Sequence, residues 1–429
     1  MADTPRHYRP RAFVGFNALL EDFAGGQDAT VHAFAVVPKS VDIERNDHRH
    51  ADVAHIEIDY RDLPLDPRTV RALAVAIAIG DVTDDESNLG DDPTARRFLG
   101  VVDEPETVLE EAGEVVRLTC RDYTAYFLDH TWDGSLIDVT VPLVRVVEAI
   151  RDATPGASTI ALSWDVGGAA GLVLQAQIGR TKFAPHAGDD TWSVLCDLLG
   201  RVGLIPVIKL DELHITSASD VGTGATRWAW GSDVSRLTYR RKFNDVASQQ
   251  IEIRCWDEQA RETRTATWPE TAIVKRRKVS ASGKVSTEAA ALLAFYVAGT
   301  YTAAQLRTIA ERIYDETARE QFEGEIETHE MLDGDDVDAL DVANGDTVEI
   351  RLGDGVLASI EGMSAAEAVA FLVNGNEPMD PDVAVAFVAS WQRAEQLTTS
   401  FYVKSARHTW SREDGYKLEI AFITIVGQG

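Results

Sequence analysis

The residue types best suited to metal binding are three histidines in the stretch NDHRHADVAH: His48, His50 and His55. A metal site needs imidazoles that converge from a rigid frame, because the ion holds its ligands in a fixed geometry. This stretch instead has the pattern of a polar turn that enters a strand, and no fixed carboxylate partner accompanies it. The sequence therefore favours a solvated turn over a metal site.

Asp333 begins an acidic segment, DGDDVDALDVANGD, whose pattern is superficially that of a calcium loop. A loop of that type needs glycine at its sixth position and glutamate at its twelfth. No register that starts at Asp333 or Asp335 supplies both residues. We interpret the segment as an acidic loop that precedes a strand, TVEIRL.

Catalytic signatures are missing from the sequence. It contains no GxSxG, HExxH, GxGxxG or GxxxxGK[ST] motif, so nucleophile-elbow, zincin, dinucleotide and P-loop chemistry lack their minimum geometry. A glycosidase pair could hide among 70 acidic residues, because its spacing is spatial rather than sequential, but nothing singles out such a pair. We predict that the protein is not an enzyme and has no catalytic residue, metal or cofactor.

One basic run stands out in this acidic chain: Lys275, Arg276, Arg277 and Lys278. Charge runs are usually solvated, and this one follows Pro269, which is typical of a loop. The functional interpretation is an electrostatic latch onto an acidic neighbour, such as a second copy of the chain. These four residues are the candidate assembly contacts.

The overall charge limits the classes of molecule that the chain can bind. The chain has 41 Lys and Arg against 70 Asp and Glu, a formal charge of −29, so its field repels phosphate backbones and anionic lipids. This charge argues against tight nucleic-acid binding. It fits a soluble acidic surface, a saline habitat, or a lumen through which DNA slides without sticking.

Compartment signals are few. No apolar stretch is long enough to cross a bilayer, and MADTPRHYRPRAF has no apolar signal region, so we expect neither a membrane anchor nor a secretory signal. Cys120, Cys196 and Cys255 are far apart and lie in apolar or strand-like settings. We interpret them as buried thiols in a reducing compartment.

The elements that carry these residues are mainly strands. Alternation with a period of two in HIEIDY and AVAIAIG predicts a sheet. A strand pair from Phe98 turns at Ala112-Gly113, and the terminal pair from Phe401 turns at Asp414-Gly415. Aligning Phe98 with Phe401 makes the two pairs near copies in pattern, although not in identity.

These copies predict an internal duplication of a small antiparallel barrel, with two unrelated β-domains as the alternative. Strands around Ile251 to Trp256, in EGEIETHEML and in GDTVEIRLG, would precede the last hairpin as HIEIDY and AVAIAIG precede the first. The predicted fold class is mainly β with α+β insertions. It contains two tube-like antiparallel β-barrel domains per chain.

Between the copies the pattern mixes helices and strands. VPLVRVVEAIRDAT has helical spacing, and DDTWSVLCDLLGRVG predicts a helix with Asp190 as its N-cap and Gly203 as its stop. LIPVIKLDELHITSA predicts a hairpin with its tip at Asp211-Glu212. The predicted boundaries are an N-terminal segment at 1–30, a first barrel at 31–140, an α+β domain at 141–228, and a second barrel at 229–429 that helical insertions interrupt at about 286–320 and 360–398.

Several of these segments together resemble the baseplate hub family of phage tails, which includes the late control protein D group and the hub half of type VI secretion spike proteins. The resemblance is carried by the following segments: VPKSVDIERNDHRHADVAHIEIDYRDLPLDPR, FLGVVDEPETVLEEAGEVVRLTCRDYTAYFLD, Trp192 with LLGRVGLIPVI, and WGSDVSRLTYRRKFNDVASQQIEIRCWD. It covers most of the chain from about Val31 to Val426. Its motifs are strand patterns rather than catalytic signatures.

The resemblance implies a homotrimer in which two barrels per chain form a pseudo-sixfold ring, so that a sixfold tail tube meets a threefold spike. The implied partners are the tail tube protein, the spike protein, baseplate wedge components and the tape-measure protein, with DNA only as passing cargo. The implied location is the tail baseplate of a virion assembled in the host cytoplasm. No spike barrel, needle or lysozyme-like domain follows the hub pattern in this sequence, so we expect separate subunits to supply them.

Two alternative functions stay open at this stage. The first is the hub of a contractile injection or secretion system, which uses the same adapter geometry. The second is a carbohydrate-binding or carbohydrate-cleaving baseplate protein, which exposed tryptophans would favour. Against it, Trp228, Trp230, Trp256 and Trp268 alternate with polar residues in predicted strands, a pattern more typical of core residues.

Overall fold

The computed structural model describes most of the chain. It covers residues 10–20, 31–66, 69–81, 95–110, 113–165, 169–174, 181–185, 188–217, 225–229, 234–241, 249–257, 261–270, 276–279, 285–288, 291–296, 301–319, 322–328, 342–343, 346–351, 363–374, 380–385, 387–389 and 400–424. Residues 333–341 and 344–345 of the predicted acidic loop, Lys275 of the basic run, and Trp230 lie outside the described residues.

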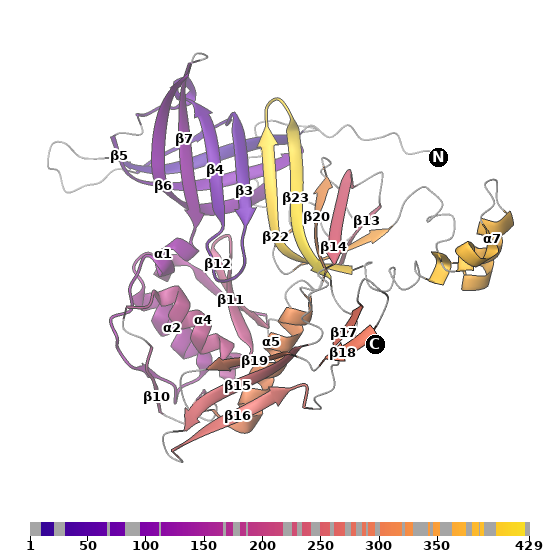
Figure 1. The fold of residues 1–429 in the computed structure, drawn as a ribbon. Coiled ribbons are helices and arrows are strands. Elements are labelled where there is room, and N and C mark those ends of the chain that lie inside the picture. The colour runs from indigo at the N-terminus through magenta and orange to yellow at the C-terminus, as the bar shows by residue number, and fades with distance from the viewer. Residues whose placement is uncertain are drawn as a thin grey trace.

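One large sheet of thirteen strands forms the frame of the molecule (Figure 1). Its strand order is β14-β20-β23-β22-β3-β4-β7-β6-β5-β1-β2, and β22 also pairs with β21, which pairs with β13. The strands of the N-terminal part are β1 Pro10–Leu20, β2 Val31–Val36, β3 Ser40–Arg45, β4 Val53–Asp59, β5 Val70–Asp81, β6 Arg96–Glu110 and β7 Gly113–Asp122. The strands of the C-terminal part are β13 Ala225–Ala229, β14 Arg236–Arg241, β20 Phe322–Thr328, β21 Thr347–Arg351, β22 Ser400–Ser411 and β23 Gly415–Thr424.

The alternation predicted from the sequence sets the two faces of this sheet. In β4, Ala54, Ile56 and Ile58 are buried, while the residues between them are half-buried or exposed. Because successive side chains on a strand point to opposite faces, one face joins the core and the other meets solvent. A single cluster of buried residues runs through both parts of the sheet, from Ala12 to Phe422.

The two parts of the sheet repeat the same topology. We call β1 to β7 the first repeat, and β13, β14 and β20 to β23 the second repeat. The path β3-β4-β7-β6-β5-β1 in the first corresponds, in both spatial and chain order, to β14-β20-β23-β22-β21-β13 in the second. One difference is direction, because β1 runs antiparallel to β5 whereas β13 runs parallel to β21.

Bulges in the two hairpins fix the correspondence to the residue. The β6–β7 register shifts between Val102 and Glu104, and the β22–β23 register shifts between Val403 and Ser405. A bulge is a defined structural feature that changes strand twist, so its recurrence at one place in two copies is strong evidence of a common design. The matched bulges place Gly100, rather than the predicted Phe98, at the position of Phe401.

Three predictions about β-elements need correction. Pro10–Leu20, predicted to precede the first barrel, is strand β1 and pairs along its length with β5. The strand around Ile251 to Trp256 belongs to a separate three-stranded sheet and not to the second repeat. The first helical insertion begins with strands, because the apolar run Ala291–Tyr296 pairs in parallel with β15.

Two insertions interrupt the second repeat. The first contains β15 Gln249–Asp257, β16 Glu262–Trp268, β17 Arg276–Val279, β18 Val285–Glu288, β19 Ala291–Tyr296 and helix α5 Ala303–Arg319, which packs on the β16-β15-β19 sheet. The second contains helix α7 Ala365–Asn374 and helical residues 381–385 and 387–389, which agrees with the two helices predicted on either side of NGNEPMDP.

The α+β region between the repeats has its own core, built from residues between Phe127 and Ile215. Its elements are α1 Thr124–Leu128, β8 Ile137–Asp138, α2 Leu143–Ala153, β9 Ala161–Trp164, β10 Lys182–Phe183, α4 Thr191–Gly200, β11 Leu204–Lys209 and β12 Glu212–Ser217; short 3-10 turns lie here at Ala157–Thr159 and Ala169–Gly171, and in the first repeat at Tyr60–Asp62.

Local chemistry explains the ends of these elements. Asp190 caps α4 as predicted, because its carboxylate accepts a hydrogen bond from the backbone N–H of Ser193 at 2.7 Å. The helix ends at Gly200, three residues before the predicted stop, and Gly203 takes a positive φ of 75° in the turn that follows. The β11–β12 turn is centred on Leu210-Asp211, one residue earlier than predicted.

Gly100 lies opposite Asp122 in the β6–β7 pair, with no room for a side chain, and this contact gives a testable prediction. A Cβ at Gly100 would lie 2.1 Å from the carbonyl oxygen of Arg121, a distance that only a backbone shift can relieve. We expect Gly100→Ala to lower the free energy of unfolding by about 2–3 kcal/mol, as overpacking does. The matched control is Gly15→Ala, whose Cβ would meet nothing closer than the Ala76 oxygen at 3.9 Å. Equal unfolding midpoints in urea for the two variants would contradict this account.

Candidate assembly interface

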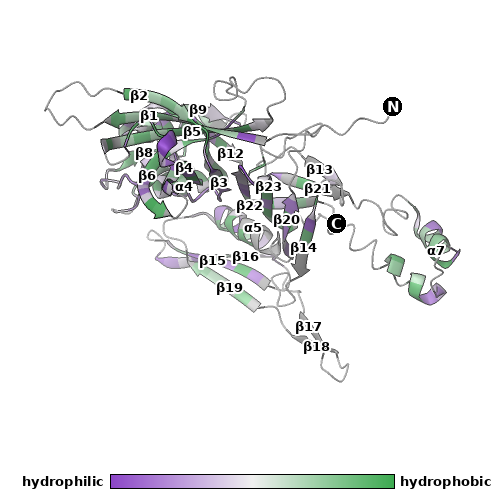
Figure 2. Cartoon of the chain, turned by 90° about the horizontal axis from the view of Figure 1, so that it is seen from above, coloured by the Kyte–Doolittle hydropathy of each residue, from purple (hydrophilic) through white to green (hydrophobic). Residues whose placement is uncertain are grey.

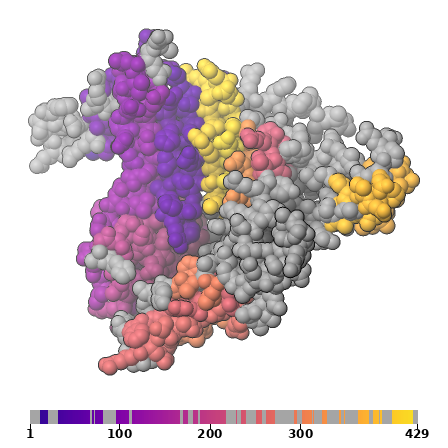
Figure 3. Space-filling view, in the orientation of Figure 1, coloured from indigo at the N-terminus to yellow at the C-terminus, as the bar shows by residue number. Residues whose placement is uncertain are grey.

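The two repeats of one chain meet edge to edge, and this junction is the best-defined interface in the molecule. Strands β22 and β3 pair antiparallel from Ala406 opposite Arg45 to Ser411 opposite Ser40. In Figure 3 the β22–β23 hairpin, drawn in yellow, lies directly beside the indigo strands of the first repeat. On the core side Trp410 lies opposite Val41, and both are almost completely buried.

On the outer face of the junction, charged side chains form ion pairs and hydrogen bonds between the two repeats. The Arg407 guanidinium donates to Asp42 at 2.9 Å and lies 3.7 Å from Glu44. This pairing raises the pKa of Arg407 above its ordinary value, mainly through the hydrogen bond to Asp42. Arg412, at the tip of the hairpin, donates to the carbonyl oxygens of Pro38 and Val37 at 2.9 and 2.7 Å.

These contacts predict a moderate loss of stability when Arg412 is replaced. We expect Arg412→Ala to lower the unfolding free energy by about 1–2 kcal/mol, because two charge-assisted hydrogen bonds to the first repeat disappear from a half-exposed site. Arg145→Ala is the control, since Arg145 is exposed and its pair with Glu148 joins neighbours on one helix. An effect no larger than that of Arg145→Ala in thermal unfolding would contradict a clamping role.

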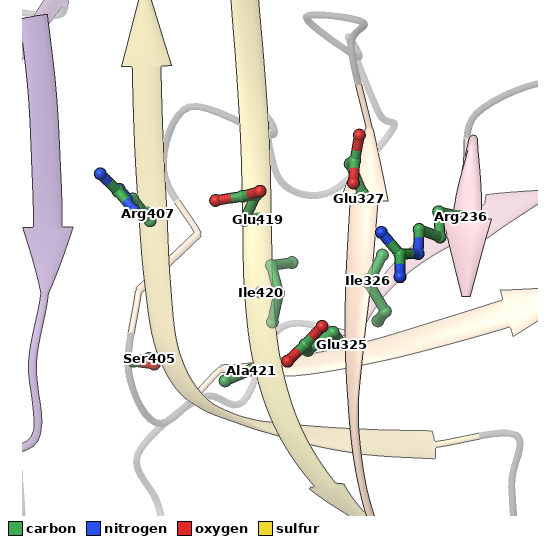
Figure 4. Close-up of a pocket in the computed structure, with 9 residues that line it drawn as sticks. All are labelled: Arg236, Glu325, Ile326, Glu327, Ser405, Arg407, Glu419, Ile420 and Ala421. Carbon is green, nitrogen blue, oxygen red and sulfur yellow. The ribbon is translucent and has the colours of Figure 1, made fainter. Parts of the chain in front are cut away.

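The outer face of the second repeat carries a shallow charged groove of about 270 Å³ (Figure 4). A single cross-strand row passes through it and across the junction: Arg236, Glu327, Glu419, Arg407 and Glu44. Adjacent strands bring these side chains within reach of one another, so opposite charges stabilise the row and like charges oppose it.

One lysine compensates the two adjacent glutamates of this row. Lys417 lies 2.7 Å from Glu419 and 3.2 Å from Glu327, and these contacts raise its pKa. The groove therefore has the chemistry of a charge-balanced surface. Among the described residues, two carboxyl groups have a raised pKa, Asp52 and Asp122. Both lie outside this groove.

Asp52 and Asp122 belong to a buried ionic cluster at the end of strands β4 and β7. Arg45 donates to Asp52 at 3.0 Å, and the backbone N–H of Asn46 donates to the same carboxylate at 2.8 Å. Asp122 accepts hydrogen bonds from the backbone and hydroxyl of Thr124, both at 3.1 Å. Burial raises the pKa of both carboxyls. Burial, with the nearby charge of Asp52 as a further cause, raises the pKa of Asp122 well above its usual range.

His408, a buried titratable group outside this cluster, joins β22 to the segment before β21. Its Nε2 lies 2.9 Å from the Val342 carbonyl oxygen, which can only accept, so Nε2 carries the proton. The Tyr416 hydroxyl then donates to Nδ1 at 2.8 Å. Burial lowers the pKa of His408 to about 3, so the ring is neutral at neutral pH.

Three of the four predicted assembly contacts lie on a separate small hairpin. Arg276, Arg277 and Lys278 are in strand β17, which pairs antiparallel with β18. This β17–β18 hairpin lies beyond the β16-β15-β19 sheet at the margin of the molecule (Figure 2). The described part of the run is thus a strand rather than a loop, and the role of the run as an assembly contact stays a prediction.

The three histidines of the polar turn lie in different surroundings. His50 is exposed and its Nδ1 lies 2.6 Å from Asp47. His55 lies on the outer face of β4, 3.4 Å from the Thr119 hydroxyl. The His48 carbonyl oxygen accepts a hydrogen bond from Trp192 Nε1 at 2.9 Å, which joins the β3–β4 turn to helix α4. In the described part of the chain no His, Cys, Asp and Glu group could hold a metal ion.

The cysteines and tryptophans divide between core and surface. Cys120 and Cys255 are buried, and Cys196 is half-buried with its pKa raised by burial to about 12. Trp228 is buried as predicted, whereas Trp256 is 56% exposed, against the expectation of a core residue. No helix in the described ranges is long and apolar enough to span a bilayer.

The junction residues were not predicted from the sequence. Nothing local marks Arg407, Arg412 or His408 as important, because their partners lie far away in the chain. The useful signal was the alternation of the terminal hairpin, which indicates that one side of each strand is buried. Aligning the two hairpins by their bulges would have identified the edge of β22 as part of an interface.

Comparison with solved structures places this architecture among tail proteins. A tail protein from Neisseria meningitidis MC58 matches with a TM-score of 0.60 and 12% identity, over 97% of this chain and 97% of that chain. The 43 kDa tail protein of prophage MuSo2 from Shewanella oneidensis matches with a TM-score of 0.56 and 12% identity, over 96% of this chain and 98% of that chain. No protein-family model matches the sequence, and the search of curated proteins gives no significant match.

The chain therefore has the fold of phage tail proteins over nearly its whole length. The resemblance to phage tail proteins that the sequence suggested is confirmed at the level of the fold. The closure of each repeat into a barrel and the trimeric ring stay predictions.

Proposed function

We propose that the protein is a structural, non-catalytic hub of a phage tail, a homotrimer that joins the sixfold tail tube to the threefold spike. The observation that carries this proposal is the repeated topology of the sheet, with the two repeats joined edge to edge through β22 and β3. Three such chains contain six similar repeats, and a ring of six can match sixfold symmetry on one side and threefold symmetry on the other.

The charge of the chain supports a role in which DNA is cargo rather than ligand. A formal charge of −29 repels a phosphate backbone, so DNA passing a central channel would not be held. The proposed partners are the tube protein, the spike protein, wedge components and the tape-measure protein. The proposed location is the tail baseplate of the virion, with assembly in the host cytoplasm.

Reconstitution tests this role directly. We expect the purified chain to form a stable complex with the tube and spike proteins encoded near its gene, and the complex should contain three copies of the chain. Size-exclusion chromatography with native mass spectrometry measures both properties. Failure to bind either protein, or robust turnover of peptidoglycan by the chain alone, would contradict the proposal.

One observation favours a second candidate function, carbohydrate binding. Trp256 lies on strand β15 with 56% of its surface exposed, and sugar faces stack on exposed aromatic rings. A glycan array would detect such binding, and a Trp256→Ala variant should lose it. An array with no signal above background would remove this candidate.

A further inference from the structure

The junction inside the chain predicts the contact between chains. Residues 406–411 of β22 project beyond the part of that strand that pairs with β21, and β3 covers their edge. The matched bulges make residues 105–110 of β6 the counterpart of this segment in the first repeat. The counterpart of β3 in the second repeat is β14.

Both counterparts have an open edge in the described structure. Residues 105–110 of β6 pair only with β7, because the pairing with β5 ends at Val101. Strand β14 pairs only with β20. Figure 1 shows the two edges on opposite flanks of the same row of strands, with β6 at one end and β14 at the other. An uncovered strand edge is a template for pairing with another chain.

We propose that β14 of one copy pairs antiparallel with residues 105–110 of β6 in a second copy, in the register that β3 and β22 use within the chain. This inference rests on the proposed trimer and names its interface. Transferring the intrachain register places Leu109 opposite Leu237 and Glu106 opposite Arg240.

The exposed apolar surface at these edges fits this register. Leu109 is 82% exposed, whereas its counterpart Trp410 is 2% exposed beneath the β22–β3 junction. Leu237 is half-buried and packs on the edge of the main core. In the proposed pair Leu109 would cover Leu237 as Trp410 covers Val41, which removes the most exposed of the large hydrophobic side chains in the described structure from water.

Charge at the interface is complementary as well. In the intrachain junction Arg407 pairs with the acidic residues of β3, and in the proposed interface the signs are exchanged. Glu106 is exposed on β6, and the register sets an arginine of β14, Arg240, across from it. Opposite charges directly across an antiparallel pair stabilise it, and like charges oppose it.

The interface joins two different surfaces, so it is a head-to-tail contact. Each added copy leaves one β6 edge and one β14 edge free, and only a closed ring covers every edge. A trimer is the ring in which six repeats alternate between intrachain and interchain junctions. The strand row would then continue without an edge around the whole assembly.

Disulfide trapping tests the register. We expect a Leu109→Cys and Leu237→Cys double variant to form intermolecular disulfides under mild oxidation, because directly opposed residues have Cβ atoms close enough to bridge. Dimer and trimer bands should appear on a non-reducing gel at least about tenfold more strongly than in the Leu109→Cys or Leu237→Cys single-substitution variant, which share the three native cysteines. The register control is Val108→Cys with Leu237→Cys, whose side chains would point to opposite faces of the sheet.

A charge exchange provides a second measurement that needs no new covalent bond. Glu106→Arg should weaken trimer formation about tenfold in mass photometry, and adding Arg240→Glu to it should restore the wild-type concentration dependence. If the wild-type chain forms trimers, neither charge variant changes trimer formation, and the double-cysteine variant gives no crosslink, this interface is overturned while the hub role stands. A wild-type chain that never forms trimers, even with tube and spike present, would overturn the hub role itself.

Discussion

When the pH is lowered from about 7.5 to about 5, the unfolding free energy of the wild-type chain is expected to fall. The fall should be about 2 kcal/mol larger than the fall in a His408→Gln variant. Burial holds the pKa of His408 at about 3 in the folded chain, whereas an unfolded histidine titrates near its ordinary value of 6.5. The unfolded state therefore binds a proton first as the pH falls. The stability from neutral His408 is fully present above about pH 6.5 and declines as the pH falls toward 3.

Urea titrations at several pH values measure this effect, with the variant as the reference for all other titrating groups. Glutamine can still donate to the Val342 oxygen, so the variant retains part of the contact without the titration. The difference in slope should approach about 1.4 kcal/mol per pH unit between about pH 6 and pH 4. Parallel pH profiles for the two proteins would show that His408 is not buried as described.

The second large effect is expected at the buried ionic cluster. Asp52→Ala should lower the unfolding free energy by about 3 kcal/mol, because it leaves the largely buried Arg45 guanidinium without its carboxylate. The backbone N–H of Asn46 loses its acceptor at the same time. Chemical denaturation at neutral pH, read by tryptophan fluorescence, measures the loss.

Asp122→Asn is the matched control for Asp52. Asp122 is buried, but its pKa is raised well above the usual range and its hydrogen-bond partner is the neutral Thr124. An amide keeps an acceptor for Thr124 and removes a charge that opposes Asp52, so we expect a change of less than about 1 kcal/mol. Similar losses for the two variants would mean that the charge pair between Arg45 and Asp52 is not what stabilises this region.

The repeating hairpins could be predicted from the sequence because their signal is local. Alternation identifies a strand with one buried face, and Gly113 and Gly415 mark the two corners with positive φ. The cap of helix α4 at Asp190 was predictable for the same reason, since the cap and its partner Ser193 are neighbours in the chain.

The elements that were missed depend on distant partners. The run Ala291–Tyr296 is short and apolar, and such a run fits a helix or a buried strand until its partner is known. Its partner β15 precedes it by more than thirty residues, and α5 covers the sheet that they form. The same is true of the buried cluster, because Asp122 meets the Asp52 carbonyl only once β4 and β7 are paired.

The candidate interface shows how far pattern alone can go. The duplication predicted from the two hairpins is present in the strand order of the whole sheet, but the alignment of Phe98 with Phe401 was two residues out of register. A shift of this kind would misplace every cross-strand partner along the β6 edge, so the assignment of Leu109 to Leu237 required the bulges.

The most direct measurement for this account is a reconstruction of the assembled tail end by electron cryo-microscopy. We predict three copies of the chain around one axis, six repeats lining a common annulus, and β14 of each copy beside residues 105–110 of β6 in the next. A different copy number, or repeats that do not share one annulus, would contradict the adapter role that the duplicated sheet supports.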